Sequence, residues 1–208
     1  VRTGKSTFIK KFMESLVIPN IPDEFERKRT LDELPQSAAG KTIMTTEPKF
    51  VPANAAKITI DEFSANIKMI DCVGYVINDA KGVDDENGPR YVMTPWYSEP
   101  IPFVEAAEIG TEKVIKDHST IGIVVTSDGS FGEFKRNDYV EAEETVINEL
   151  KEIGKPYIVL LNTTNPSGEE AIKITNNLSV KYSVPVLPIN VEMMQERDMY
   201  NILKEALY

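Results

Sequence analysis

The sequence is poor in the side chains that build several common kinds of site. Cys72 is the only cysteine and His118 the only histidine among 208 residues. An internal disulfide is therefore impossible, and zinc sites made of cysteine and histidine, like histidine-dependent triads, are excluded. A lone cysteine fits a reducing compartment, so we predict a cytoplasmic protein in which Cys72 fills apolar space.

Basic residues and long apolar runs are scarce too. The 23 Lys and Arg residues are outnumbered by 33 Asp and Glu residues, and the formal net charge is −10. Broad nucleic-acid binding is therefore not expected. No apolar run approaches the roughly 20 residues that a helix needs to cross a bilayer, so we predict no transmembrane segment. The length suits one domain, residues 1–208, with a proper hydrophobic core.

The sequence does contain the closing half of a phosphate-binding loop. The chain opens with VRTGKST, and Gly4, Lys5 and Ser6 match the end of the pattern G-x-x-x-x-G-K-[ST]. The first glycine of that pattern would lie two positions before Val1. We therefore expect the chain to be a fragment cut inside its own nucleotide site, without the strand that leads into the loop.

The residues of this loop have distinct predicted roles. Consecutive N–H groups would surround an anionic phosphate, beside the positive end of the helix that follows. Gly4 lets the backbone approach the phosphate, and Lys5 would reach the β- and γ-phosphates. Ser6 would bind Mg²⁺ through its hydroxyl, and Thr7 would hydrogen-bond the α-phosphate. The nucleotide-binding residues predicted here are Arg2, Thr3, Gly4, Lys5, Ser6 and Thr7.

A second, independent signal follows at Asp71. The segment 66–71 (NIKMID) alternates in part between polar and apolar residues and is predicted to be a strand that ends in an acid. Beside a phosphate loop, such an acid holds Mg²⁺, usually through water. Gly74 would bring its N–H to the γ-phosphate. An acidic strand end before a turn glycine is common by itself, so this assignment depends on the loop at residues 1–7.

Two threonines are candidates for sensing the γ-phosphate. Thr45 and Thr46 lie between the helix after the loop and the strand that ends at Asp71, where a switch segment is expected. A threonine there can coordinate Mg²⁺ through its hydroxyl and contact the γ-phosphate through its N–H. The spacing does not choose between the two, and each also fits an ordinary start to an extended segment.

The order of elements predicts an α/β domain. Segments 56–61 and 66–71 are predicted to pair as an antiparallel hairpin. Segment 75–118 is predicted to be a long, irregular insertion, either a lid on its own domain or an aromatic surface for a partner. The apparent capping box from Ser167 to Glu170 predicts a helix start. The other predicted helices are 23–34, 104–117, 135–153 and 194–207, and the other predicted strands are 120–126, 157–161 and 184–191.

Alternating strands and helices after residue 119 imply a parallel sheet with right-handed crossovers. The predicted fold is the three-layer P-loop NTPase sandwich of the translation-factor GTPase type, mostly parallel with one antiparallel strand. Pro185 and Pro188 place strand 184–191 at an edge of the sheet. The strand before Val1 is expected at the centre, between the strand that ends at Asp71 and strand 120–126.

The base-binding loop departs from the GTPase pattern. P-loop GTPases carry N-K-x-D after the fifth strand, whereas this chain reads NTTN from Asn162 to Asn165. An amide cannot offer guanine a paired carboxylate, so ATP becomes a credible nucleotide. Both asparagines are assigned to the base, and both also suit a turn before Pro166. Tyr75 stands where related enzymes orient water with glutamine, so hydrolysis is expected to be slow or completed by another subunit.

Four segments together resemble the stage IV sporulation protein A family of spore-coat morphogenetic ATPases. They are VRTGKSTFIKKFME, KTIMTTEPKFVP, KMIDCVGY and LLNTTNP, and the resemblance covers essentially the whole chain, as an N-terminal nucleotide-binding domain. The resemblance assigns the phosphate lysine to Lys5, the sensor threonines to Thr45 and Thr46, and the metal-side acid to Asp71. From the resemblance we expect the first strand, the first glycine and the family's middle and C-terminal domains to lie outside residues 1–208.

The resemblance implies a function as well as a site. In this family ATP hydrolysis with Mg²⁺ drives polymerisation into a static basement layer on the mother-cell side of the forespore outer membrane. The resemblance also implies docking through a small amphipathic membrane-bound peptide and recruitment of further coat proteins. Two alternatives stay open: a translation-factor-like GTPase regulator, and a scaffold whose nucleotide site is vestigial.

Overall fold

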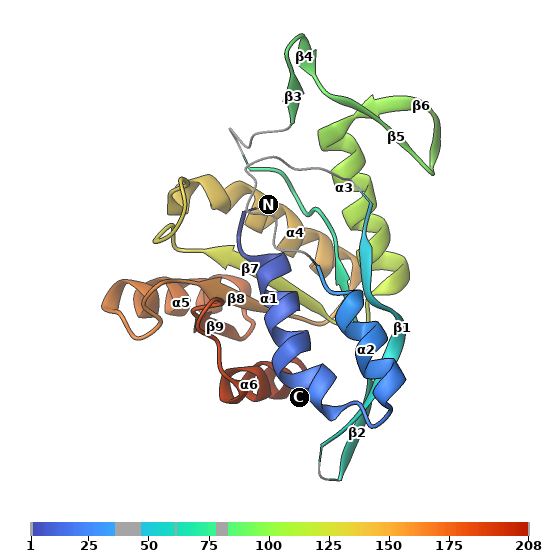
Figure 1. Cartoon of the computed structure of the whole chain (residues 1–208). Helices are drawn as coiled ribbons and strands as arrows, with labels where there is room; N and C mark the ends of the chain where they lie inside the picture. Colours follow the sequence, from blue (N-terminus) through green and yellow to red (C-terminus); the bar gives the residue numbers. More distant parts are fainter. Residues whose placement is uncertain (1, 36–46, 61, 78–82, 208) are drawn as a thin grey trace.

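The computed structural model describes residues 2–35, 47–60, 62–77 and 83–207. Its helices and strands are shown in Figure 1. The helices are α1 (Lys5–Phe12), α2 (Glu24–Asp32), α3 (Phe103–Lys113), α4 (Arg136–Ile153), α5 (Glu169–Tyr182) and α6 (Glu196–Leu207). The strands are β1 (Lys49–Ile60), β2 (Phe63–Asp71), β3 (Asp84–Asp85), β4 (Gly88–Pro89), β5 (Tyr91–Thr94), β6 (Tyr97–Pro102), β7 (Gly122–Ser127), β8 (Tyr157–Asn162) and β9 (Val186–Ile189).

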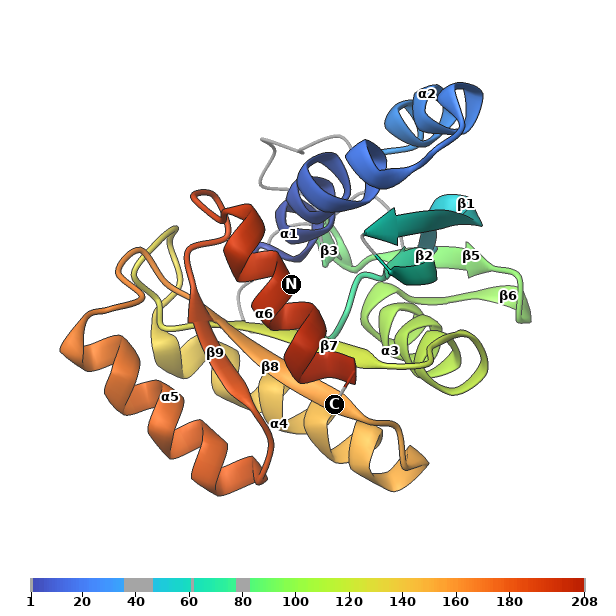
Figure 2. The ribbon, with the colours of Figure 1, turned by 90° about the horizontal axis from the view of Figure 1, so that it is seen from below.

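A parallel sheet in the order β7-β8-β9 forms the centre of the C-terminal half, as the alternation of elements predicts. All six residues of β8 are buried, because helices cover both faces of the strand. Ile158 and Leu160 pack with α1 and α6, whereas Val159 and Leu161 pack with α4 and α5. Figure 2 shows these two helix layers on opposite sides of the sheet. A continuous apolar run is therefore the expected sequence for β8.

The prediction that strand 184–191 lies at an edge is confirmed for β9 in the described sheet. β9 pairs only with β8 there, and Pro188 lies opposite Leu161. Proline lacks an N–H to donate to a further strand, so an edge position tolerates it. The end of α4 is also as predicted: Gly154 follows the helix with a φ of 74°, a left-handed conformation that glycine adopts readily.

The capping box predicted at Ser167 and Glu170 is wrong. α5 begins at Glu169, its N-cap residue is Gly168, and no side chain caps the helix there. The backbone of Gly168 instead donates to the carbonyl of Asn165 at 2.9 Å, which continues the turn that follows β8. The turn, and not a serine side chain, therefore sets where this helix starts.

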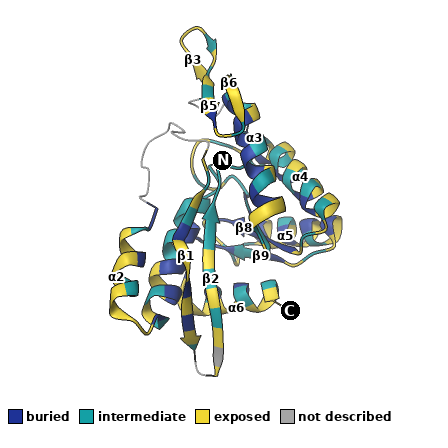
Figure 3. Cartoon of the chain, turned by 90° about the vertical axis from the view of Figure 1, so that its right-hand side faces the viewer, coloured by how far each residue is buried: buried dark blue, intermediate teal, exposed yellow. Residues whose placement is uncertain are grey.

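The predicted hairpin of 56–61 and 66–71 is confirmed and is longer than expected. β1 and β2 pair antiparallel from Ile60 and Phe63 to Lys49 and Asp71, with an irregularity between Val51 and Ala56. Among the described strands, these two pair only with each other. Figure 3 shows exposed residues along α2 and the outer parts of this hairpin.

The insertion 75–118 is more regular than predicted. It contains two small hairpins, β3–β4 and β5–β6, which extend away from the parallel sheet at the top of Figure 1. The helix predicted at 104–117 is present as α3, followed by a π-helical turn at Val114–His118. Phe103 and Val114 are buried, whereas Tyr91 and Tyr97 are exposed. The insertion thus packs through α3 and presents the two tyrosines of its second hairpin, Tyr91 and Tyr97, to solvent.

A cavity of about 740 Å³ lies between β2 and β7. Side chains of both strands line it, together with residues of α1 and α6 and of α3 and α4. Examples are Phe8, Met69, Val125 and Val146, and Cys72 lies at its wall half-buried, in the apolar setting that its residue type predicts. The edge strands β2 and β7 of the two sheets therefore lie on either side of an apolar space beside the start of α1.

Candidate functional site

The phosphate loop turns sharply just before α1. Arg2 has a φ of 62° and Gly4 a φ of 92°, both in the left-handed region, and the Gly4 carbonyl accepts the first helical hydrogen bond from Phe8 at 2.8 Å. A methyl group at Gly4 would lie 2.5 Å from the Asn162 amide nitrogen. Only glycine fits here, on both backbone and steric grounds. The N–H groups at the start of a helix lack partners within it and attract anions.

Side chains from two other elements hold consecutive carbonyls of the loop. The Asn162 amide donates to the carbonyl of Thr3 at 3.0 Å, and the hydroxyl of Tyr139 donates to the carbonyl of Arg2 at 3.3 Å. Asn162 ends β8, and Tyr139 lies in the first turns of α4. The loop is therefore held by β8 and α4, two elements of the C-terminal half.

Lys5 forms an ion pair with Asp71, which connects the start of α1 to the end of β2. The side chains of Lys5 and Asp71 are only 25% and 13% exposed. The structure thus brings together the two residues that the sequence assigns to the phosphates and to the metal. Gly74 follows with a φ of 75° and lines the adjacent cavity.

The residues at this point fit a magnesium ion held in part by a nucleotide. Mg²⁺ prefers oxygen ligands and keeps few of them from protein, typically a carboxylate and a hydroxyl beside substrate phosphates. Asp71 carries a carboxylate and Ser6, next to Lys5, a hydroxyl, so these two side chains would hold the ion. Within the described ranges no cluster of three or more His, Cys, Asp or Glu side chains forms a self-sufficient metal site. Thr45 and Thr46, the predicted sensors, lie outside the described residues.

The NTTN segment occupies the end of β8, where the sequence places the base-binding loop. Both polar atoms of the Asn162 side chain contact protein, because the oxygen also accepts from the N–H of Val191 at 3.1 Å. Asn162 therefore connects the phosphate loop with the segment after β9. Asn165 is exposed in the turn before α5, and its N–H donates to the Thr163 hydroxyl at 3.2 Å. The structure thus places Asn162 under the phosphate loop and Asn165 at the surface.

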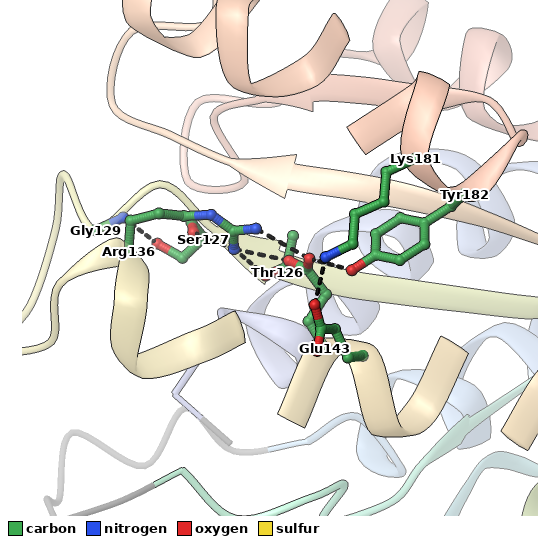
Figure 4. A network of polar contacts seen from close by, with 8 residues as sticks. Thr126, Ser127, Gly129, Arg136, Glu143, Lys181 and Tyr182 are labelled. Carbon is green, nitrogen blue, oxygen red and sulfur yellow. Dashed lines mark hydrogen bonds and ion pairs between the residues drawn. The ribbon is translucent and has the colours of Figure 1, made fainter. Parts of the chain in front are cut away.

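Sequence reasoning missed a buried polar network behind the loop, shown in Figure 4. Arg136 forms a two-pronged ion pair with Glu143, at 2.7 and 2.9 Å, and Glu143 is 3% exposed. The Tyr182 hydroxyl donates to Glu143 at 2.8 Å. Burial and the Glu143 carboxylate raise the pKa of Tyr182. An arginine and a glutamate seven positions apart on one helix were the only sequence signal, and that spacing is equally typical of a solvated helix face.

None of the described helices is both long and apolar enough to cross a membrane.

The chain is similar throughout to known sporulation proteins. It is 61% identical to stage IV sporulation protein A of Bacillus anthracis and 60% identical to that of Bacillus subtilis (strain 168), each over 100% of this chain and 42% of the relative. It is 56% identical to that of Clostridioides difficile (strain 630), over 100% of this chain and 43% of the relative. The chain therefore spans less than half the length of these curated relatives. No solved structure matches it.

A family of domains matches as well. Residues 1–208 match the family described as the ATPase domain of stage IV sporulation protein A. This match and the relatives confirm the resemblance carried by the phosphate loop, the TTEP segment and the NTTN segment. The chain belongs to the stage IV sporulation protein A ATPase domain family.

Proposed function

We propose that this chain binds ATP with Mg²⁺ at the phosphate loop and hydrolyses it slowly, in step with self-polymerisation of the protein that contains it. The contact between Lys5 and Asp71 carries this proposal, because it brings a phosphate-binding cation and a metal-binding acid to the N-terminus of one helix. The family match supports the choice of ATPase chemistry.

In this proposal the ion pair is exchanged when a triphosphate enters. Lys5 turns from Asp71 to the β- and γ-phosphates, since their several negative charges attract an ammonium more strongly than one carboxylate does. Asp71 then becomes available to a hydrated metal ion, together with the Ser6 hydroxyl. Bound Mg²⁺ would supply neutralisation of the charge on the β- and γ-phosphates. Thr7 binds the α-phosphate, the N–H of Gly74 binds the γ-phosphate, and Thr45 or Thr46 senses it.

Adenine is the proposed base because the segment 162–165 offers no carboxylate to guanine. Both polar side-chain atoms of Asn162 are hydrogen-bonded to protein groups. We therefore propose that Asn165 and the backbone of the loop contact the base. Competition of ATP and GTP for the full-length protein tests this choice. Equal binding of the two nucleotides would favour the GTPase regulator.

The wider function is proposed from the same family. Turnover is slow because Tyr75 replaces a water-orienting glutamine, and assembly completes the site. The polymer forms the basement layer of the coat on the mother-cell side of the forespore outer membrane. A small amphipathic membrane-bound peptide and further coat proteins are its proposed partners, and nucleic acid is not.

We also propose that one more strand, continuous with the phosphate loop, fills the cavity between β2 and β7. Three observations support this. The cavity of about 740 Å³ separates two sheet edges, helices border it on both faces, and Thr3 and Lys5 line it beside the loop. A strand there would join the sheets into one, in the central position that the sequence predicts. The domain would then have the three-layer sandwich of a P-loop NTPase.

Phosphate release by the full-length protein tests the proposed activity. Lys5→Ala removes charged hydrogen bonds to phosphate and is expected to lower the rate at least about tenfold. Lys10→Ala is the matched control, because Lys10 lies on the same helix and, within the described part of the chain, its ammonium pairs only with Glu14, at 4.0 Å. A wild-type rate no higher than that of Lys5→Ala would favour the scaffold with a vestigial site.

A further inference from the structure

We propose that the hydroxyl of Tyr139 is a positioning group for the phosphate loop, acting through the carbonyl of Arg2. This inference rests on the proposed ATP site, because it assigns a residue that shapes that site without touching the nucleotide. Tyr139 is 2% exposed, and its hydroxyl donates to the Arg2 carbonyl at 3.3 Å. The contact joins two parts of the chain that are 137 positions apart.

The loop needs such an anchor because its backbone is unfavourable where it turns. Arg2 is a non-glycine residue with a φ of 62°. A left-handed conformation is unfavourable for a residue with a side chain, and it persists only where surrounding contacts hold it. Tyr139 fixes the carbonyl of Arg2, and Asn162 fixes the next carbonyl, that of Thr3. With both carbonyls held by protein groups, the turn that opens α1 is set before a nucleotide arrives.

Tyr139 is itself held by a series of contacts. The N–H of Gly129 donates to the Ser127 hydroxyl at 2.9 Å, and the Ser127 side chain lies close enough to Tyr139 to oppose the rise of its pKa. Burial raises the pKa of Tyr139, so its hydroxyl stays protonated as a donor to Arg2. The end of β7 is thereby connected to the phosphate loop through one side chain.

The buried network shown in Figure 4 holds Ser127, at the end of this series of contacts that lies farthest from the phosphate loop. Arg136 donates to the Ser127 carbonyl at 3.2 Å and to the Thr126 hydroxyl at 3.1 Å. Glu143 holds the guanidinium, and Tyr182 on α5 holds Glu143. Ser127 therefore cannot shift without breaking buried, charge-assisted bonds, which are the strong ones.

An experiment must distinguish this positioning role of the Tyr139 hydroxyl from a purely structural role of the Tyr139 ring. The ring packs with Phe134, at a centroid distance of 6.3 Å, and with Ile77. Tyr139→Phe keeps that ring and removes only the hydroxyl. Tyr157→Phe is the matched control, because the Tyr157 hydroxyl is also buried and has no hydrogen-bond partner among the described residues.

The test compares the two variants in the full-length protein, with amide hydrogen exchange at residues 2–5 and the KM and kcat for ATP as readouts. One ordinary hydrogen bond corresponds to about a fivefold change in an equilibrium at 25 °C. Tyr139→Phe is expected to speed loop exchange about fivefold without nucleotide and to raise KM by a similar factor, with kcat nearly unchanged. Tyr157→Phe is expected to leave both unchanged.

Loop exchange that is the same in Tyr139→Phe and the wild type overturns the proposal, and so does faster exchange with an unchanged KM. Matching changes in both variants also overturn it, since they reflect the loss of any buried hydroxyl. A wild type that hydrolyses no ATP would instead overturn the proposed function. The exchange comparison needs no nucleotide and would still decide whether Tyr139 holds the loop.

Discussion

The two halves of the molecule differ in how completely their strands are packed. Every residue of β8 is buried between two layers of helices. β2 alternates instead between exposed and half-buried residues, and the cavity of about 740 Å³ separates it from β7. Yet Ala65, Ile67 and Met69 on β2 alternate with polar residues as an interior strand face would. Burial of a strand is thus decided by the elements beside it as much as by its own sequence.

The phosphate loop lies at the boundary between these halves. Lys5 follows the loop and contacts Asp71 in the β2 half, whereas Tyr139 and Asn162 hold the loop from the β8 half. The site is therefore set by how the two halves are joined.

The largest expected effect concerns packing on the two neighbouring strands β7 and β8. Ile158 and Ile123 lie opposite each other in the sheet, but Ile158 is 2% exposed and Ile123 lines the cavity. Ile158→Ala is expected to lower the free energy of unfolding by about 3 kcal/mol. If a strand fills the cavity in the full-length protein, Ile123→Ala should cost about as much there. Chemical denaturation measures both, and a cost below about 1 kcal/mol at Ile123 would contradict the added strand.

This contrast also explains what the sequence could predict. The strands and helices after residue 119 follow local patterns, so β8, α4 and the glycine at 154 were found nearly to the residue. The phosphate loop and Asp71 were recognisable because their chemistry fixes residue types at short spacing. The contact of Asp71 with Lys5 depends on how the chain folds, so no local pattern predicts it.

Contacts between distant segments account for what was missed. The network joins Glu143 to Arg136 on the same helix and to Tyr182, 39 positions further along the chain, and no local pattern encodes it. The hairpins of segment 75–118 are two to six residues per strand, too short for alternation to stand out. The start of α5 was misplaced because a turn after β8, rather than a serine cap, sets it.

A second prediction concerns the space around the phosphate loop. Gly4→Ala places a methyl group 2.5 Å from the Asn162 amide nitrogen, whereas a methyl group at Gly132 meets nothing within 4 Å. Both glycines have left-handed φ values, 92° and 75°, so both variants carry similar backbone strain. Gly4→Ala is expected to weaken ATP binding at least about tenfold, and Gly132→Ala to leave it unchanged. Equal ATP affinity in the two variants would remove the steric argument for the loop.

A further expected effect is a pH dependence in the C-terminal half. Burial, and then the charge of Glu152, raise the pKa of Glu149 to about 7, and one of its buried oxygens has no hydrogen-bond partner among the described residues. The folded state therefore retains a proton that the unfolded chain, with a pKa near 4.5, releases. Stability from this group is present below about pH 4.5 and is lost as the pH rises to about 7.

Glu149→Gln is expected to remove that loss. It should raise the free energy of unfolding by about 2 kcal/mol at pH 8 and change it little at pH 4.5. The value at pH 8 is smaller than the free energy that corresponds to the whole pKa shift, because the side chain keeps some contact with water. Glu152→Gln is the control, since that side chain is exposed and only adds to the shift. Urea unfolding at the two pH values measures both variants. A pH slope in Glu149→Gln that matches the wild type would place the titrating group elsewhere.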